Sequence, residues 1–427
     1  MGSNHKVAIL GAGIIGLSTA LELQRRFPNC DVTVIADKFN MDTTSDGAAG
    51  LFEPSPNFMG PDLETTKEWI RYSYDHYAGL LSENCGVQVI NGYNLAKSEK
   101  QCAENHYLKP VLPVYKRMSE EELAEIGPGD WKYGIYMSTL VIPNRIFLPW
   151  CMQKFKAAGG KVIEKYISSF SELGSEYNTI FNCTGLGART LCNDMHVIPV
   201  RGQTIRIKAP HITNFYKNEY DTYIIPNGFD SLVTLGGTQN FGHVNRCVES
   251  TDTESILART EELLPGVGAC GGGQCWVGLR PHRYRVRVEC EQTPGGKISH
   301  PHLRDFYNMP EAGAYIIPSY GGLVTLGGTQ DYGNARLGVD RFDSRAILNR
   351  TAAVRPEILA APVEKVWVGL RPYRHHVRVE RDLTGAAQIV HNYGHGGYGV
   401  TSAPGSARCA VSVFEQSHKA SYNGAPT

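Results

Sequence analysis

The first forty residues show two apolar runs on either side of an amphipathic stretch. Residues 6–10 (KVAIL) and 31–37 (DVTVIAD) are short and apolar, as buried strands are, whereas residues 17–27 (LSTALELQRRF) repeat their apolar side chains at helical spacing. A strand, a helix and a second strand in this order predict a βαβ unit with parallel strands.

A glycine motif lies between the first strand and the helix. GAGIIG places Gly11, Gly13 and Gly16 in the pattern G-x-G-x-x-G, and Asp37 follows 21 residues after the last of them. The first glycine allows a tight turn, the second lets backbone approach a pyrophosphate, and the third lets helix and strand pack closely. The helix N-terminus offers unpaired N–H groups to phosphate, and the Asp37 carboxylate can accept hydrogen bonds from a ribose. These features predict a dinucleotide site, with a plain structural turn as the weaker alternative.

The segment after this unit is polar at first and then rich in small residues. Thr43, Thr44 and Ser45 can donate hydroxyl groups to phosphates, and residues 48–50 (AAG) are small enough for backbone to lie against a flat ring. The same letters also fit an ordinary polar loop with a helix cap. The residues alone favour neither interpretation.

The rest of the chain mixes helical and strand patterns. Residues 63–83 and 147–160 have helical apolar spacing, and the second segment ends on glycines. Short apolar or alternating runs typical of strands occupy residues 161–170, 178–185, 204–208, 223–226, 232–238 and 285–289.

Composition is that of a globular protein with more than one domain. The chain has 427 residues, a length that exceeds what one hydrophobic core usually spans, and 42% of its residues are hydrophobic. Basic and acidic residues both number 42, so no net field attracts nucleic acid or an anionic membrane, and no apolar run is long enough to cross a bilayer. The 11 cysteines are scattered without a C-x-x-C pair, so neither a disulfide framework nor a metal site is expected.

The most unusual pattern is a tandem repeat. WVGLRPHRYRVRVE at 276–289 returns as WVGLRPYRHHVRVE at 367–380, and the similarity extends over two abutting units of 91 residues, 210–300 (unit one) and 301–391 (unit two). Removing one unit from the 427 residues would leave 336. Two copies do not make a solenoid. Three arrangements are open: unit one docked whole, unit two docked whole, or the first half of unit one with the second half of unit two.

Six motifs then carry a family resemblance. They are ADKFNMDTTSDGAAG (36–50), FNCTGLGAR (181–189), PVRGQ (199–203), YIIP, VGLRP and HNYGHGGYG (391–399). In this order they resemble the D-aspartate oxidase and D-amino-acid oxidase family, with wording closer to the D-aspartate branch, over about residues 1–400.

The resemblance implies an α/β fold, in which a Rossmann-type FAD-binding domain is interleaved with a substrate domain built on a large mixed or antiparallel sheet. Here the substrate segment is duplicated. The expected division is 1–209 for the FAD-binding domain with part of the substrate domain, 210–300 and 301–391 for the two repeat units, and 392–427 for the return to the FAD-binding domain.

The resemblance also implies FAD as the cofactor and assigns its contacts. The pyrophosphate lies at Gly11, Ala12, Gly13, Ile14, Ile15 and Gly16, the adenosine side at Asp37 and Lys38, and further phosphate contacts at Thr43, Thr44 and Ser45. The flavin borders Ala49, Gly50 and Leu51, its far end is wrapped by Gly396, Gly397, Tyr398, Gly399, Val400 and Thr401, and further FAD contacts fall at Ile167 and Thr184.

The implied reaction is oxidative deamination of a D-amino acid by oxygen, giving a 2-oxo acid, ammonia and hydrogen peroxide. The GLRP arginine holds the substrate α-carboxylate, because a guanidinium presents two parallel donors to two oxygens, and the YIIP tyrosine assists. The repeat offers Arg280 with Tyr223 and Arg371 with Tyr315, and Gly397 completes the catalytic set. We favour Arg371, since its strand runs without interruption into the glycine loop.

An acidic substrate, D-aspartate or D-glutamate, is the preferred expectation. The D-aspartate branch typically has arginine directly after GGT, where this chain has Gln239 and Gln330. A neutral D-amino-acid oxidase and an FAD-binding protein inactivated by the duplication are the alternatives. The candidates to replace the missing charge are Lys217, Arg246, His282, His375 and His376.

The C-terminal segment departs from the family pattern. Pro404 and Gly405 interrupt what should begin a helix, so its start is expected to fray. The chain ends in GAPT rather than the family's peroxisomal tripeptide, so a cytoplasmic location is expected, with the peroxisomal matrix as the weaker alternative. The expected partners are the small-molecule substrate and oxygen, without nucleic acid or membrane, and a homodimer is left open.

Overall fold

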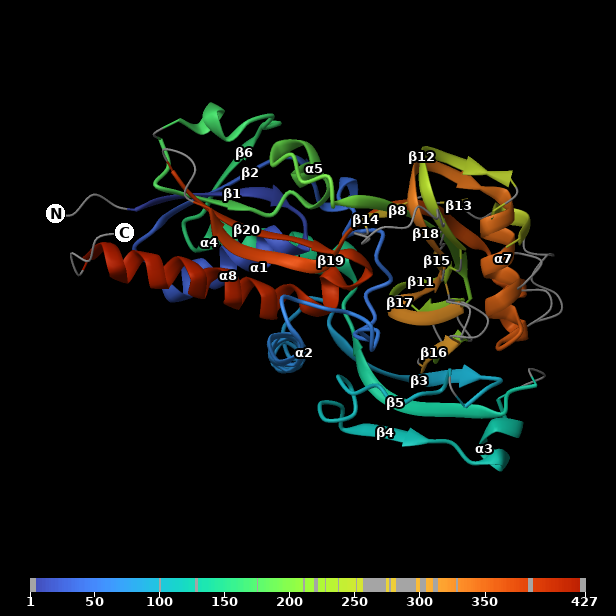
Figure 1. Cartoon of the computed structure of the whole chain (residues 1–427). Helices are drawn as coiled ribbons and strands as arrows, with labels where there is room; N and C mark the ends of the chain where they lie inside the picture. The colour runs from blue at the N-terminus through green and yellow to red at the C-terminus, as the bar shows by residue number, and fades with distance from the viewer. Residues whose placement is uncertain are drawn as a thin grey trace.

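The computed structural model shows two adjoining β-sheets with helices packed around them (Figure 1). The described residues are 5–99, 101–126, 130–174, 176–209, 212–218, 222–226, 228–236, 238–250, 252–255, 274–275, 278–281, 297–299, 305–309, 314–327, 329–382 and 387–422.

Five of the described strands pair in parallel. The sheet that they form is the one nearer the chain ends (Figure 1). β1 (Lys6–Ala12) lies between β2 (Asp31–Phe39) and β7 (Thr179–Asn182). β6 (Lys161–Glu164) extends the sheet beside β2, and β20 (Gln388–His395) extends it beside β7. The predicted βαβ unit is therefore confirmed.

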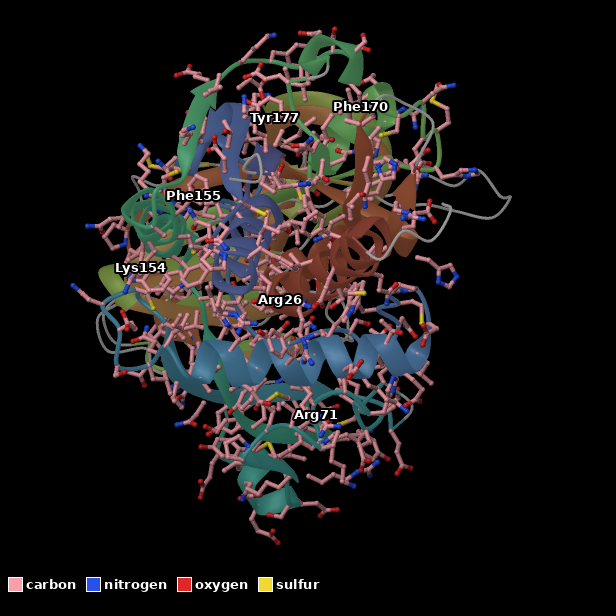
Figure 2. All side chains as sticks on the ribbon, turned by 90° about the vertical axis from the view of Figure 1, so that its left-hand side faces the viewer. Arg26, Arg71, Lys154, Phe155, Phe170 and Tyr177 are labelled. Carbon is pink, nitrogen blue, oxygen red and sulfur yellow. The ribbon has the colours of Figure 1, made fainter. Side chains whose placement is uncertain are left out.

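Helices α1 (Ile14–Arg26), α4 (Asn144–Ala157) and α8 (Gly399–Tyr422) pack together against this sheet. Phe155 of α4 is fully buried in the core between helices and sheet, whereas Tyr177 belongs to a separate core (Figure 2). Alternate residues of a strand point to opposite faces, so each core takes every second residue of β1. Val7 and Ile9 join the core with Phe155, and Ala8 and Leu10 join the core with Tyr177.

The second sheet is largely antiparallel and has β8 (Ile198–Lys208) near its centre. Its successive strands are β4 (Val114–Arg117), β5 (Tyr133–Val141), β3 (Gln88–Ala96), β9 (Phe215–Asn218), β10 (Tyr223–Pro226), β11 (Gly228–Gly236), β8 and β19 (Val363–Asp382). Only β3 and β9 run parallel within this series. β19 pairs first with β8 and then with β20, so one long strand joins both sheets.

The repeat contributes a second set of strands to the same place. These strands are β12 (Thr238–Glu249), β13 (Gln274–Cys275) and β14 (Gly278–Pro281) from unit one, β15 (Lys297–Ser299) at the end of unit one, and β16 (Asp305–Met309), β17 (Ala314–Gly327) and β18 (Thr329–Asp340) from unit two. Gly278 and Gly369 both pair with Gly202 of β8, and Phe215 and Phe306 both pair with Gly92 of β3.

Equivalent strands of the two units therefore claim one place. Each residue on a strand edge has its N–H and C=O groups directed at one neighbouring strand about 4.8 Å away, so that edge is hydrogen-bonded to one copy at a time. The tyrosines of the two YIIP motifs compete in the same way, because the rings of Tyr223 and Tyr315 overlap and claim one position. The fold thus has one place on β8 and β3 and two candidate occupants for it.

Most predicted elements are present with shifted ends. The helix predicted at 63–83 is α2 (Leu63–Ala78), which Asp62 caps through the Thr65 N–H, and the helix predicted at 147–160 starts earlier as α4. The strand predicted at 161–170 ends at Glu164, and the remainder continues into a 3-10 turn, Phe170–Leu173, capped by Ser169. The strand predicted at 285–289 lies outside the described residues. Among the described residues, the sequence patterns missed the helices α3 (Glu120–Ala124), α5 (Ala188–Leu191) and α7 (Arg341–Ala352).

The expectation of a frayed C-terminal helix is wrong. α8 runs without a break from Gly399 to Tyr422 and contains Pro404. Pro404 has no N–H to give to the Val400 carbonyl, and the buried Tyr77 hydroxyl donates a 2.7 Å hydrogen bond to that carbonyl instead. Gly405 lets α8 approach α2 closely, because a Cβ there would overlap the Trp69 backbone, and its N–H donates to the Ser73 hydroxyl.

Removing the Tyr77 hydroxyl should lower the stability of the protein, because the hydrogen bond to the Val400 carbonyl is lost. In Tyr77→Phe the Val400 carbonyl is left buried without a donor, so we expect unfolding to become easier by about 1–3 kcal/mol in thermal or urea unfolding. Replacing Pro404 by Ala as well restores an N–H four residues beyond Val400. The double variant should therefore recover part of the loss, and a Tyr77→Phe variant as stable as the parent would contradict this role.

The described part of the chain shows no helix that is both long and apolar enough to cross a membrane. Within the same ranges, no group of three or more His, Cys, Asp or Glu side chains is arranged to hold a metal ion.

Candidate active site

The glycine motif makes the turn between β1 and α1. Gly11 has a φ of +101°, and a Cβ on it would lie 2.6 Å from the Cys183 carbonyl oxygen. A Cβ on Gly16 would overlap the Gly11 carbonyl oxygen, and one on Gly13 would lie 3.1 Å from the Ser45 hydroxyl. Only glycines let α1 begin this close to β1, and they leave bare backbone at its N-terminus.

The hydroxyl-rich loop at 43–45 packs against that helix end. The Ser45 hydroxyl accepts a 2.9 Å hydrogen bond from the Ile14 N–H, while the Thr43 hydroxyl donates back to the Asn40 carbonyl. Thr44 and Ser45 therefore face the start of α1, and Thr43 serves its own loop.

The small residues that follow are clamped against β5. Gly50 has a φ of +82°, and a Cβ on it would overlap the Ile142 carbonyl oxygen. The Ile142 N–H donates a 2.7 Å hydrogen bond to the Gly50 carbonyl, and Ala49 and Leu51 are buried. The segment 48–51 thus presents a fixed backbone surface rather than a mobile loop.

A cavity that is open to solvent lies between these segments and the loop that follows β20, and the space in it, adjoining solvent included, is about 560 Å³. Part of its lining comes from the predicted set and from Ala48: Ile14, Ile15, Thr44, Ser45, Ala48, Gly396, Gly397, Gly399 and Val400. The remaining lining residues were not predicted: Cys183, Gly185, Asn392, Tyr393, Gly394 and His395. Their signal was present in the motifs FNCTGLGAR and HNYGHGGYG.

Other predicted contacts surround the cavity without lining it. Asp37 and Lys38 lie half-exposed at the end of β2, with 4.0 Å between the Lys38 Nζ and an Asp37 carboxylate oxygen. The Thr184 hydroxyl donates to the Asn182 side-chain oxygen at 2.7 Å, and Ile167 packs against the core that contains Tyr177. The remaining members of the set that do not line the cavity are Gly11, Ala12, Gly13, Gly16, Thr43, Ala49, Gly50, Leu51, Tyr398 and Thr401.

His395 is the buried titratable group of the cavity wall. It is 2% exposed, and neither ring nitrogen has a hydrogen-bond partner in the described structure. Burial lowers the pKa of His395 to about 3, so the imidazole is neutral at physiological pH. A neutral ring offers one donor and one acceptor to whatever fills the cavity.

The depressed pKa of His395 predicts a pH dependence of stability. The unfolded chain binds a proton at this histidine below about pH 6.5 while the folded chain does not, so the stabilisation is complete above that pH and is lost as the pH falls toward 3. Between pH 8 and about pH 5, we expect wild type to lose about 2 kcal/mol of unfolding free energy more than His395→Gln does. Parallel pH profiles for the two proteins in chemical denaturation would contradict a buried neutral histidine.

Asp46 links the loop at 43–50 to the second sheet through ion pairs. Its fully buried carboxylate lies 3.2 Å from an Arg145 guanidinium nitrogen and 3.4 Å from one of Arg206, which is itself fully buried in β8. Two guanidinium groups offset the cost of burying one carboxylate. The loop at 43–50 is therefore positioned by a residue of the strand on which the two repeat units compete.

The two GLRP arginines occupy equivalent backbone positions. Arg280 on β14 and Arg371 on β19 both pair with Val200 of β8, and their side chains lie outside the described parts. The YIIP tyrosines are buried, Tyr223 completely and Tyr315 at 8% exposure. Among these candidates, Arg371 belongs to the strand that continues to β20 and the glycine loop.

Lys217 has a partner that the sequence patterns did not indicate. Its Nζ lies 2.9 Å from a carboxylate oxygen of Glu53, and the Asn94 side chain donates to the other oxygen at 2.9 Å. Both charged side chains are largely buried. Of the remaining basic candidates, His376 has Nδ1 3.1 Å from the Gly60 carbonyl oxygen, and the side chains of Arg246, His282 and His375 are outside the described parts.

Comparisons with known proteins agree with this architecture. A family model described as FAD dependent oxidoreductase matches residues 6–290 and again 282–413, as expected if the chain repeats part of that family's sequence. D-aspartate oxidase of Homo sapiens is 34% identical over 292 residues, covering 67% of this chain and 84% of that relative. D-amino acid oxidase of Dugesia ryukyuensis is 33% identical over 307 residues, covering 69% of this chain and 89% of that relative.

Solved structures show the same fold at low sequence identity. Glycine oxidase from Bacillus cereus superposes with a TM-score of 0.60 over 97% of this chain and 96% of that protein, at 14% identity. The parallel sheet joined to a largely antiparallel sheet is thus an architecture that this chain shares with that solved structure. The chain belongs to the FAD-dependent oxidoreductase family.

The cavity, together with the segments that surround it, fits FAD, the cofactor of this family. Gly11, Gly13 and Gly16 keep the start of α1 clear of side chains, as a bound pyrophosphate would require, and Asp37 near the end of β2 is an acceptor of the kind that a ribose hydroxyl would need. At the other end, the glycine loop 394–399 and the unpaired nitrogens of His395 leave room and polar partners for a flat heterocycle.

Proposed function

We propose that this protein oxidises D-amino acids with oxygen, giving a 2-oxo acid, ammonia and hydrogen peroxide. The observation that carries the proposal is the backbone of Arg371 on β19, the strand that leads into the β20 glycine loop lining the cavity. Its relatives named D-aspartate oxidase and D-amino acid oxidase support the substrate class.

The protein's contribution to this reaction is orientation. Bound FAD supplies the hydride acceptor. The Arg371 guanidinium binds the substrate α-carboxylate in two parallel hydrogen bonds, and a YIIP tyrosine, Tyr223 or Tyr315, donates a further one. Gly397 lines the cavity and has no side chain, so it would not hinder the approach of the α-carbon. These contacts hold the α-carbon in one orientation. The proposed reaction therefore needs no side chain that acts as a catalytic base.

The cofactor contacts are proposed from the same geometry. Residues 11–16 hold the pyrophosphate, Asp37 and Lys38 the adenosine side, and residues 43–45 the phosphates, while residues 49–51 and 396–401 border the flavin and Ile167 and Thr184 complete the contacts. The proposed domain division is 1–209, the two units 210–300 and 301–391, and 392–427.

We propose D-aspartate or D-glutamate as the preferred substrates. The greater similarity to a D-aspartate oxidase supports an acidic side chain. A neutral D-amino acid is the second candidate, because the ion pair with Glu53 already neutralises Lys217, the nearest basic candidate before the YIIP motif.

A substrate panel tests the proposal. Peroxide release should be fastest with D-aspartate, slower with D-alanine and absent with L-aspartate, measured on protein reconstituted with excess FAD. A higher kcat/KM for D-alanine would establish the neutral candidate. Peroxide from L-aspartate, or from neither D-amino acid, would refute the proposed function.

A further inference from the structure

The first residue that distinguishes the two units lies beside Glu53. Lys217 of unit one and Asn308 of unit two both pair with Asn94 of β3. Lys217 forms the buried ion pair with Glu53, whereas an asparagine in its place carries no charge. Seating unit two here would leave a carboxylate of 5% side-chain exposure without its cation, which is strongly unfavourable.

The second distinguishing residue lies between α7 and the 3-10 turn Pro356–Ala360. Arg355 of unit two places its guanidinium carbon 4.7 Å from the ring centroid of Tyr216, a fully buried residue of β9 in unit one. The residue equivalent to Arg355 in unit one is Leu264, which has no charge for such a cation–π contact. Unit two has Tyr307 at the position equivalent to Tyr216, so this contact favours the second half of unit two with either first half, and Lys217 decides which first half is seated.

Chain entropy does not decide between the three arrangements. Each of them leaves one excursion of 91 residues between seated strands, and closing a loop depends only weakly on where it is placed. The choice is therefore made by side chains, and only one arrangement keeps both the Lys217–Glu53 and the Arg355–Tyr216 contacts.

We propose that the seated substrate domain is a hybrid, with β9 and β10 from unit one and α7 and β19 from unit two. The crossover falls between residues 226 and 341. Its consequence for catalysis rests on the proposed function: the active site combines Tyr223 of unit one with Arg371 of unit two. The second half of unit one and the first half of unit two then contribute nothing to the site, which is built from the two remaining halves.

Hydrogen exchange on the full-length chain with FAD tests the hybrid directly, because the copies yield peptides of different sequence. We expect amides of β9 and of residues 363–371 in β19 to exchange at least about 100-fold more slowly than those of β16 and β14. Protection of β16 with β19 means that unit two is seated whole, and protection of β9 with β14 means that unit one is. Either result, or a bimodal pattern with both copies protected in different molecules, overturns the proposal.

Two reciprocal substitutions test why the hybrid is preferred. Lys217→Asn gives unit one the residue of unit two, and Arg355→Leu gives unit two the residue of unit one. Each should lower Tm by a few degrees, on the order of 3–5 °C for Lys217→Asn, and Lys217→Asn should transfer exchange protection from β9 toward β16. The matched controls Asn308→Ala and Leu264→Ala should leave both readouts unchanged. If Lys217→Asn changes neither Tm nor the exchange pattern, the Lys217–Glu53 ion pair is not what selects unit one.

Neither readout depends on turnover, so failure of the hybrid and failure of the proposed function are distinguishable. If the protein oxidises D-amino acids, Tyr223→Phe should raise KM about tenfold more than Tyr315→Phe does. The opposite order, with the exchange pattern intact, would reject the composite site while leaving the hybrid fold.

Discussion

Replacing Arg371 by alanine is expected to lower kcat/KM for the preferred D-amino acid by a factor of about a hundred to several thousand. The guanidinium is the proposed partner of the substrate α-carboxylate, and removing one member of a charge pair that is buried in the complex costs about 3–5 kcal/mol. Steady-state peroxide release measures the effect, and FAD absorbance after desalting shows that the cofactor site is intact.

Arg280→Ala is the matched variant, since Arg280 pairs with the same residue of β8, Val200, from the other unit. Both arginines claim the same place on β8, so only one of them can occupy it and bind the carboxylate there. We expect Arg280→Ala to change kcat/KM by less than about twofold, as for a solvated surface residue. The reverse result would assign the site to unit one. Small and equal effects from both variants would remove the arginine from the mechanism.

Gly16→Ala is expected to weaken FAD binding strongly. Its Cβ would overlap the Gly11 carbonyl oxygen, so α1 would have to move away from β1 and carry its N-terminal N–H groups with it. Overpacking of this kind costs about 1–3 kcal/mol, and we expect the FAD Kd to rise roughly 100-fold. Flavin fluorescence titration of the apoprotein gives the Kd, with circular dichroism as the check on folding.

Two glycine variants accompany that test. Gly79 ends α2 with a φ of −65°, and a Cβ on it would meet atoms at 3.4 Å, an ordinary contact, so Gly79→Ala should bind FAD as the parent does. Gly13→Ala brings a Cβ to 3.1 Å from the Ser45 hydroxyl and should weaken FAD without unfolding the chain. Parental affinity in both Gly13→Ala and Gly16→Ala would show that the turn does not hold the pyrophosphate.

Local chemistry explains why the nucleotide half could be predicted well. Gly11 and Gly16 are required by contacts within a single turn, and the helix and strands around them have unbroken apolar periodicity. The segments 43–51 and 391–399 were recognisable as motifs, and the structure brings them to one cavity although more than 300 residues separate them in the chain.

Long-range pairing explains what could not be predicted. Pro404 indicates a broken helix in any local analysis, and only the packing of Tyr77 against Val400 shows how the backbone is satisfied. The sequence alone suggests that Lys217 is a solvated surface charge, whereas the pairing of β9 with β3 places it opposite Asn94 and beside Glu53. The sequence also contains the repeat in full, but that both copies fit the same residues of β8 is a property of sheet register, which emerges only in the fold.

Anaerobic mixing with substrate tests the central claim most directly. The account predicts that the purified, FAD-loaded protein is yellow and that D-aspartate bleaches the flavin absorbance in the absence of oxygen, whereas L-aspartate leaves it unchanged. Readmitting oxygen should restore the colour with release of hydrogen peroxide. A protein that binds FAD but keeps its full flavin absorbance with D-aspartate, D-glutamate and D-alanine alike would contradict the assignment of this chain as a D-amino-acid oxidase.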